Sequence, residues 1–238
     1  MVPCPHIFDP AEKYISLVIP AYNEEHRLPG ALDETLNYLQ QRAANDKTFT
    51  YEVIIVDYGS TDGTKRVAFE FVKRFSVDNV RVILLGKKHG KGEAIRKGML
   101  HSRGELLLMF DADGATRVDD LEKLENQINA VAKKGQQLED STGRDSTIRI
   151  SDVPAAAFGS QKMVPQFPDE RFPYRGSLAA GSGIRDTQCG FKMFTRSAAR
   201  KLFLNIRLKR SIMSIFNQLE YILLSLLLLE AFFSWSIL

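Results

Sequence analysis

The chain has 238 residues, of which 44% are hydrophobic and 26% charged, with a formal net charge of +3 at pH 7. These proportions are typical of one globular domain, with or without appendages, and the mild charge gives no case for a nucleic-acid partner. Two cysteines, Cys4 and Cys189, cannot form a disulfide framework, and no N-x-S/T sequon occurs. Both facts favour a reducing, cytosol-facing location.

The first half of the chain alternates between short apolar runs and amphipathic segments. Strands are predicted at 16–22, 52–56, 80–85 and 106–110, with helices at 29–42, from the turn GSTDGT to residue 75, at 92–102 and at about 118–133. Near-continuous apolar strands separated by helices predict a parallel sheet that is covered on both faces. Right-handed crossovers between such strands make the sheet open and doubly wound.

The pattern changes after residue 134. A polar loop is predicted at 135–152, a short strand at 155–160, an irregular stretch at 161–183, a strand at 191–195 and a helix at 197–204. Residues 221–238 are almost wholly apolar around Glu230, which favours either a membrane-inserted or interfacial segment or a buried tail. The first 14 residues lack the apolar core of a signal peptide, so none is expected.

Polar residues follow three of the predicted strands, at 20–25, 57–60 and 111–113. The carboxyl ends of parallel strands share one edge of the sheet, where open α/β sheets bind ligands, so these segments are expected to converge. Asp111 and Asp113 would repel each other there, and a divalent cation removes the conflict. Hard oxygen ligands suit Mg²⁺ or Mn²⁺ with a substrate diphosphate, although such aspartate pairs also cap turns.

A basic, glycine-containing segment, KKHGKG at 87–92, precedes the third predicted helix. Its cations and the following helix amino terminus favour an anion, while a solvated basic turn is the alternative. The spacing matches neither a Walker A loop nor the dinucleotide-binding glycine fingerprint. A nicotinamide-dependent oxidoreductase is therefore not expected.

Five motifs occur in order: VIPAYNEE, IIVDYGSTDGT, GKGEAIRKG, MFDADGAT and RDTQCGFKMFTR. Together they resemble the family-2 glycosyltransferases with the GT-A fold, and among these the dolichyl-phosphate β-glucosyltransferases. The resemblance implies an α/β, Rossmann-like, open and mostly parallel sheet with helices on both faces, an irregular acceptor region and a C-terminal apolar helix. It places the glycosyltransferase domain at 14–204, with a shortened irregular insert at 161–183, and an apolar tail at 211–238.

The resemblance implies a metal-dependent, inverting transfer of glucose from UDP-glucose to dolichyl phosphate, giving dolichyl β-D-glucosyl phosphate for N-glycan precursor assembly. The implied cofactor is Mg²⁺ or Mn²⁺, and the implied place is the cytosolic face of the endoplasmic reticulum membrane. A phosphate monoester is mostly dianionic at pH 7, so the acceptor needs positioning more than deprotonation. Two alternatives stay open: another polyprenyl-phosphate transfer, such as that of mannose, and a variant that binds a nucleotide-sugar with impaired or no transfer.

The resemblance also implies roles for individual residues. It assigns to the nucleotide-sugar site Pro20, Tyr22, Glu24, Asp57, Tyr58, Lys91, Asp111, Ala112 and Asp113, with Asp57 and Tyr58 beside the uracil. It assigns the metal to Asp111 and Asp113, catalysis to Asp113, Asp186 and Gln188, and the acceptor phosphate to Arg185, Lys192 and Arg196.

The sequence departs from the family pattern in several places. Tyr58 stands where the family has the second of two adjacent aspartates, and a phenol is not equivalent to a carboxylate. Gln161 takes the position of an arginine, and the residues after Arg210 replace a segment with an acidic pair. Members of the family usually have an N-terminal membrane anchor, and any membrane contact of this sequence is expected from the apolar tail. Tyr58, Gln161 and the replaced segment after Arg210 are the basis of the impaired-variant alternative.

Overall fold

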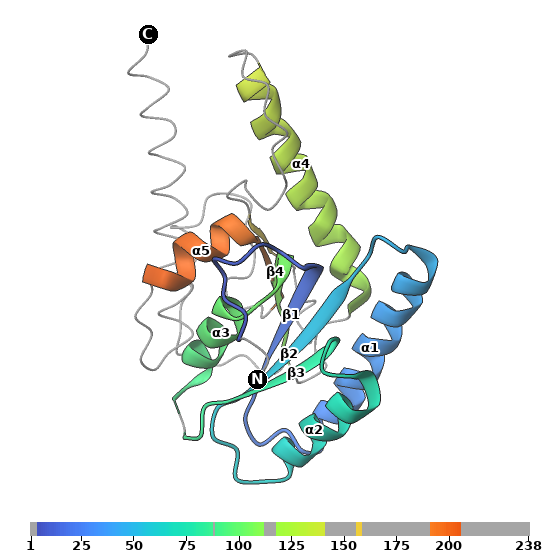
Figure 1. Ribbon diagram of the computed structural model, residues 1–238, viewed down its shortest axis with the longest axis vertical. Helices are drawn as coiled ribbons and strands as arrows, with labels where there is room; N and C mark the ends of the chain where they lie inside the picture. Colours follow the sequence, from blue (N-terminus) through green and yellow to red (C-terminus); the bar gives the residue numbers. More distant parts are fainter. Residues whose placement is uncertain (1–3, 88, 112–117, 141–155, 159–190, 206–238) are drawn as a thin grey trace, which may run out of the picture.

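The computed structural model describes residues 4–87, 89–111, 118–140, 156–158 and 191–205. At 131–140, 156–158 and 205 the backbone alone is described. Within the described residues one sheet has the strand order β3-β2-β1-β4-β6-β5 (Figure 1). The strands are β1 (Lys13–Ala21), β2 (Tyr51–Asp57), β3 (Val80–Leu84), β4 (Gly104–Met109), β5 (Ala156–Phe158) and β6 (Lys192–Thr195). β1 to β4 are mutually parallel, and β6 runs antiparallel to β4 and β5.

Helices cover both faces of the sheet, because the apolar residues of the strands point alternately to either side. One face packs against α1 (Leu28–Asn45), α2 (Thr64–Phe75) and α4 (Leu121–Asp140), and the other against α3 (Lys91–Leu100) and α5 (Arg196–Asn205). A 3₁₀ turn, Val118–Asp120, precedes α4. The predicted α/β architecture, an open and mostly parallel sheet between helices, is confirmed.

The predicted elements of the first 110 residues are confirmed, with ends that differ by a few residues. The loop predicted from residue 135 is wrong in its first part, because α4 continues to Asp140. Good helix formers surround Gly135, and a single glycine costs a helix only about 1 kcal/mol. The irregular stretch 161–183 and the tail 211–238 lie outside the described residues. Of the helices that are described, none is long and apolar enough to cross a membrane.

A close approach between α3 and the sheet brings the start of this helix to the carboxyl edge. Gly98 of α3 lies directly on Val18 of β1, and a Cβ at this position would collide with the Val18 side chain and lie 3.1 Å from Val56. The missing side chain lets the helix pack against the strands. Lys91, the first residue of α3, is thereby placed near the end of β4.

The amino edge of the sheet contains a buried ion-pair network around Glu52, whose side chain is 0% exposed. Its carboxylate accepts hydrogen bonds from Ser16 Oγ at 2.6 Å, the Arg103 amide at 2.6 Å, Arg103 Nε at 2.8 Å and Arg81 Nη1 at 2.9 Å. Burial raises the pKa of Glu52, but these donors and the two guanidinium charges outweigh it and leave the pKa below its usual value. Glu52 of β2 is thereby linked to Ser16 of β1, to Arg81 of β3 and to Arg103, which directly precedes β4.

Candidate functional site

The ends of three parallel strands meet at the carboxyl edge. Ala21 of β1 is level with Asp57 of β2, and the Tyr58 amide donates to the Ala21 carbonyl at 3.2 Å. The Phe110 amide after β4 donates to the Val18 carbonyl at 3.0 Å. The segments that begin at residues 22, 58 and 111 therefore leave the sheet side by side, as predicted.

Hydrogen bonds join the loop after β1 to the loop after β2. Asn23 Oδ1 accepts from the Thr61 amide at 2.9 Å, and the Asn23 amide donates to Ser60 Oγ at 3.0 Å. The Glu24 amide donates to Thr64 Oγ1 at 2.8 Å. Asn23 has φ of 55°, a left-handed conformation that asparagine tolerates better than most residues. Asn23 was not among the predicted site residues, although an asparagine directly after a strand is a signal for such a turn.

Two aromatic rings lie directly after the ends of β1 and β2. Tyr22 and Tyr58 are stacked, with ring centroids 5.2 Å apart and an interplanar angle of 19°. Burial, followed by the negative charges of Glu24 and Asp111, raises the pKa of Tyr58 to about 12. The Tyr58 hydroxyl therefore remains protonated at neutral pH. We refer to Tyr22 and Tyr58 as the tyrosine pair.

The carboxylate of Asp57 faces the protein interior. Its side chain is 0% exposed, and its oxygens accept from the Gly59 amide at 3.2 Å and the Ser60 amide at 3.3 Å, with Lys65 Nζ at 4.0 Å. A fully buried carboxylate cannot touch a base in this conformation. The structure therefore corrects the predicted contact of Asp57 with uracil: this residue holds the turn that carries Tyr58.

Asp111 and Lys91 lie beside the tyrosine pair. Lys91 Nζ is 2.5 Å from Asp111 Oδ1, yet this buried oxygen accepts no hydrogen bond of regular geometry. The lysine is at the amino terminus of α3, where helix amides and the helix dipole also favour an anion. A carboxylate that follows a buried strand and pairs with a lysine at an anion-favouring helix end fits a divalent cation with a diphosphate.

The structure describes only some of the residues that were predicted for the metal, for catalysis and for the acceptor phosphate. Ala112, Asp113, Arg185, Asp186 and Gln188 lie outside the described residues. Among the residues that are described, no group of three or more His, Cys, Asp or Glu side chains is placed to hold a metal. Pro20 is buried in β1. Lys192 is 2% exposed and pairs across the sheet with Met109, close to the carboxyl edge.

Arg196 lies at the wrong edge of the sheet for an acceptor phosphate. Its guanidinium donates to the carbonyls of His6 at 3.0 Å, Asp9 at 2.8 Å, Ser102 at 3.0 Å and Gly104 at 2.9 Å. Because β6 runs antiparallel to β4, the chain that passes Met109 at residue 192 has reached the amino edge by residue 196. The prediction for Arg196 is therefore wrong, and this arginine joins the N-terminal segment to the sheet.

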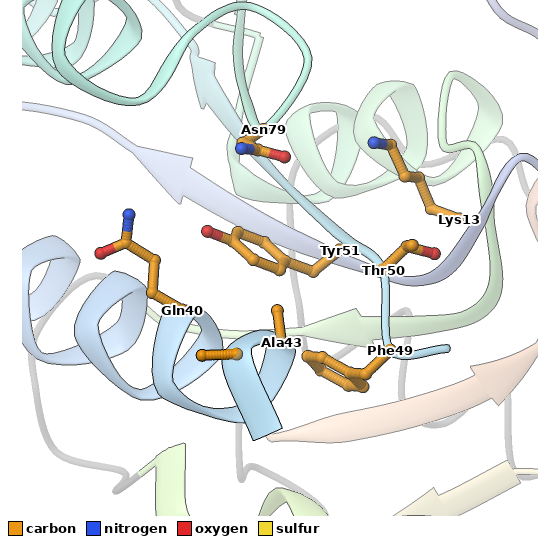
Figure 2. A pocket seen from close by; sticks show the side chains of 8 residues that line it. Lys13, Gln40, Ala43, Phe49, Thr50, Tyr51 and Asn79 are labelled. Carbon is orange, nitrogen blue, oxygen red and sulfur yellow. The ribbon is translucent and has the colours of Figure 1, made fainter. Parts of the chain in front are cut away.

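A separate hollow of about 410 Å³ also lies at the amino edge, between the end of α1 and the start of β2 (Figure 2). Lys13, Phe49, Thr50 and Tyr51 are part of its lining. Lys13 is already paired with Asp78 at 2.6 Å. None of the residues predicted for the functional site lines this hollow, so it is not the site described above.

The family model named Glycosyl transferase family 2 matches residues 16–203, from β1 to α5. The chain belongs to this family. The family-2 chain is 46% identical over 209 residues to the dolichyl-phosphate beta-glucosyltransferase ALG5A of Trichomonas vaginalis. The matched region covers 88% of this chain and 61% of that relative. It is 43% identical over 206 residues to the human dolichyl-phosphate beta-glucosyltransferase, covering 87% and 62%. This family-2 chain thus spans less than two thirds of the length of these relatives.

Among solved structures, the family-2 chain is similar to the mannosyltransferase PcManGT from Pyrobaculum calidifontis in complex with GDP-Man and Mn²⁺. The two are 25% identical, and the likeness covers 46% of this chain and 29% of that one with a TM-score of 0.37. A likeness at this TM-score supports no argument about the site.

Proposed function

We propose that this family-2 glycosyltransferase transfers glucose from UDP-glucose to dolichyl phosphate, with inversion, at the cytosolic face of the endoplasmic reticulum membrane. The observation that carries the proposal is the position of Lys91 and Asp111 at the amino terminus of α3, beside the tyrosine pair. A nucleotide-sugar needs a surface for a base next to a place for a diphosphate. The names of the relatives support glucose as the sugar and dolichyl phosphate as the acceptor.

Each part of the site has a role in this reaction. Asp111, together with Asp113, would hold Mg²⁺ or Mn²⁺, and the ion supplies positive charge to the diphosphate that leaves. Lys91 and the amides at the start of α3 stabilise the same developing charge on the leaving group. Asp57 keeps the turn after β2 in place, so that Tyr58 stays beside Tyr22.

The acceptor side is proposed from residues near the end of β4. A phosphate dianion attacks without losing a proton, so the protein needs to align it rather than deprotonate it. Of the residues predicted for the acceptor phosphate, Lys192 is described at this edge of the sheet, level with Met109. Arg185, Asp186 and Gln188 precede β6 in the chain, and we propose that they approach the sugar and the acceptor phosphate.

A second function is a nucleotide-sugar-binding protein with impaired or no transfer. Tyr58 favours this alternative, because a neutral phenol stacked on Tyr22 stands where the family pattern has a carboxylate. The two functions differ in whether bound donor is consumed. They agree on the donor site.

The test is a transfer assay with labelled UDP-glucose, a short polyprenyl phosphate and Mg²⁺ or Mn²⁺. Metal-dependent appearance of label in the lipid phase supports the transferase, whereas donor binding without lipid product supports the second function. Asp111→Asn should abolish metal-dependent donor binding. The matched control, Asp33→Asn, removes an exposed carboxylate of α1 that pairs with Arg74 of α2 and should bind the donor normally. Equal binding by both variants would overturn the proposed site.

A further inference from the structure

The hollow at the amino edge of the sheet is lined by residues that lie far apart in the chain. Gln40 and Ala44 come from the end of α1, Tyr51 begins β2, and Asn79 directly precedes β3 (Figure 2). Its volume of about 410 Å³ falls in the range of small-molecule sites, roughly 300–1,000 Å³. The hollow and the carboxyl edge lie at opposite ends of the strands, so a ligand here leaves the donor site open.

Three uncharged polar groups reach this hollow: the amides of Gln40 and Asn79 and the hydroxyl of Tyr51. Figure 2 shows the Tyr51 hydroxyl between the two amides in this view. Within the described part of the chain, none of the three has a protein hydrogen-bond partner. Burial raises the pKa of Tyr51, so its hydroxyl keeps the proton at neutral pH. All three groups are therefore able both to donate to a ligand and to accept from it.

The cations around the hollow are already paired. Lys13 Nζ donates to Asp78 at 2.6 Å. The Arg42 guanidinium, 4.2 Å from the centroid of the Phe49 ring, donates to both oxygens of Glu125 at 3.1 and 2.7 Å. An anionic ligand would compete with these carboxylates, and no acidic residue is among the described lining to attract a cation. The charge distribution therefore favours a neutral ligand.

The remaining lining gives this neutral ligand an apolar surface. Phe49, Ala43 and Ala44 contribute it, and the Phe49 ring is fixed between Arg42 and the ring of Tyr14, whose centroid is 5.4 Å away. A primary amide presents a donor and an acceptor side by side, which match two neighbouring hydroxyls of a ligand. A molecule with neighbouring hydroxyls and an exposed C–H face satisfies both kinds of lining.

We propose that the hollow binds a neutral sugar ring, with neighbouring hydroxyls on the amides of Gln40 and Asn79 and C–H groups against Phe49. The Tyr51 hydroxyl accepts from or donates to a further hydroxyl of the ring. Gln40 and Ala44 are exposed, so the site is open to solvent and the expected dissociation constant is weak, roughly 1–10 mM. A free monosaccharide and the terminal unit of a glycan share this chemistry. The inference does not depend on the transfer reaction proposed above.

The test titrates the full ¹⁵N-labelled chain with methyl β-D-glucopyranoside and follows the side-chain amide signals by nuclear magnetic resonance. The signals of Gln40 and Asn79 should shift and saturate. Gln40→Ala and Asn79→Ala should each weaken binding by about three- to tenfold, because each removes hydrogen bonds to the ligand. Ala44→Trp fills the hollow from an exposed position and should abolish binding. Gln41→Ala, the matched control, changes an exposed neighbour that is not part of the lining and should bind normally.

Two further probes test the chemistry of the ligand. Cyclohexylmethanol has a ring of similar size with a single hydroxyl and should bind at least about tenfold more weakly. Methyl β-D-glucuronide carries a carboxylate and should bind no more tightly than the glucoside. Maltose separates the two sources of the ligand, because a site for a glycan binds it more tightly than the glucoside and a site for a single sugar does not.

Several results would overturn the inference. One is that the glucoside, at about ten times the upper expected constant, moves neither side-chain amide signal. Others are that folded Ala44→Trp binds as the unchanged chain does, that cyclohexylmethanol binds as tightly as the glucoside, or that the glucuronide binds more tightly. Asp111→Asn should leave glucoside binding unchanged. Loss of binding in Asp111→Asn, with normal binding by Ala44→Trp, would assign the sugar to the donor site and leave the proposed function standing.

Discussion

Replacing Glu52 by glutamine tests how the strands are held in the register that forms the site. The substitution keeps the shape of the side chain but removes the charge that Arg81 and Arg103 share. Loss of one partner from a buried ion pair costs about 3–5 kcal/mol. Arg103 keeps Asp78 at 3.1 Å, and Arg81 keeps the His101 carbonyl at 3.1 Å, so the lower end, about 3 kcal/mol, is expected.

The cost of the Glu52→Gln substitution should depend on pH. The folded-state pKa of Glu52 is lowered relative to the unfolded chain, because its hydrogen-bond donors and the two arginines outweigh the effect of burial. A carboxyl group with a lowered pKa stabilises the fold fully above the unfolded value, about 4.3, and loses this contribution as pH falls through the folded value. The difference between the two proteins should therefore be constant from pH 7 to about 5 and shrink below about 4.

Equilibrium urea unfolding at pH 7, 5 and 3.5 measures this difference in the free energy of unfolding. The matched control is Glu70→Gln, which removes an exposed partner of Arg66 on α2 and should cost less than about 0.5 kcal/mol. A loss below about 1 kcal/mol for Glu52→Gln at pH 7 would refute the argument that the network is tightly coupled. A loss that grows as the solution becomes more acidic would refute the direction of the pKa shift.

Three further substitutions test other parts of the structure. Gly98→Ala should cost about 1–3 kcal/mol in thermal unfolding because its Cβ collides with Val18, whereas Gly30→Ala in α1, with nothing within 4 Å, should be neutral or stabilising. Arg196→Met should cost roughly 3 kcal/mol, because it leaves main-chain carbonyls unsatisfied, and should leave UDP affinity of the folded protein unchanged, as measured by calorimetry. Lys91→Met should weaken UDP binding about tenfold and leave uridine binding unchanged in the same titrations. The reason is that uridine lacks the diphosphate, the part of UDP that the lysine charge is proposed to contact.

The sheet was predictable because its signals are local. An apolar run such as that of β2, in which every residue is buried, identifies a strand covered on both faces. The polar residues that follow β1, β2 and β4 then share one edge as a matter of topology. Tyr22, Tyr58 and Asp111 were located in this way, without knowledge of a single side-chain contact.

The roles of individual charged residues were not predictable, because they depend on the partners that the fold brings. Asp57 and Asp111 both end a buried strand, yet one is fully buried in its own turn and the other meets Lys91 from α3. Arg196 lies four residues after Lys192, and the antiparallel direction of β6 takes it to the opposite edge. Sequence proximity to a site is therefore weak evidence of membership when the strand between runs away from it.

The two edges of the sheet use buried charge for different purposes. At the amino edge, Glu52 and Arg196 each have several internal partners, and this satisfaction is what makes them structural. At the carboxyl edge, Asp111 has an oxygen that accepts no hydrogen bond of regular geometry and a lysine that a ligand could draw away. A buried charged group that is incompletely satisfied is costly for a fold to keep unless binding recovers the cost. In this respect Asp111 differs from Glu52 and Arg196, the buried charged residues of the amino edge.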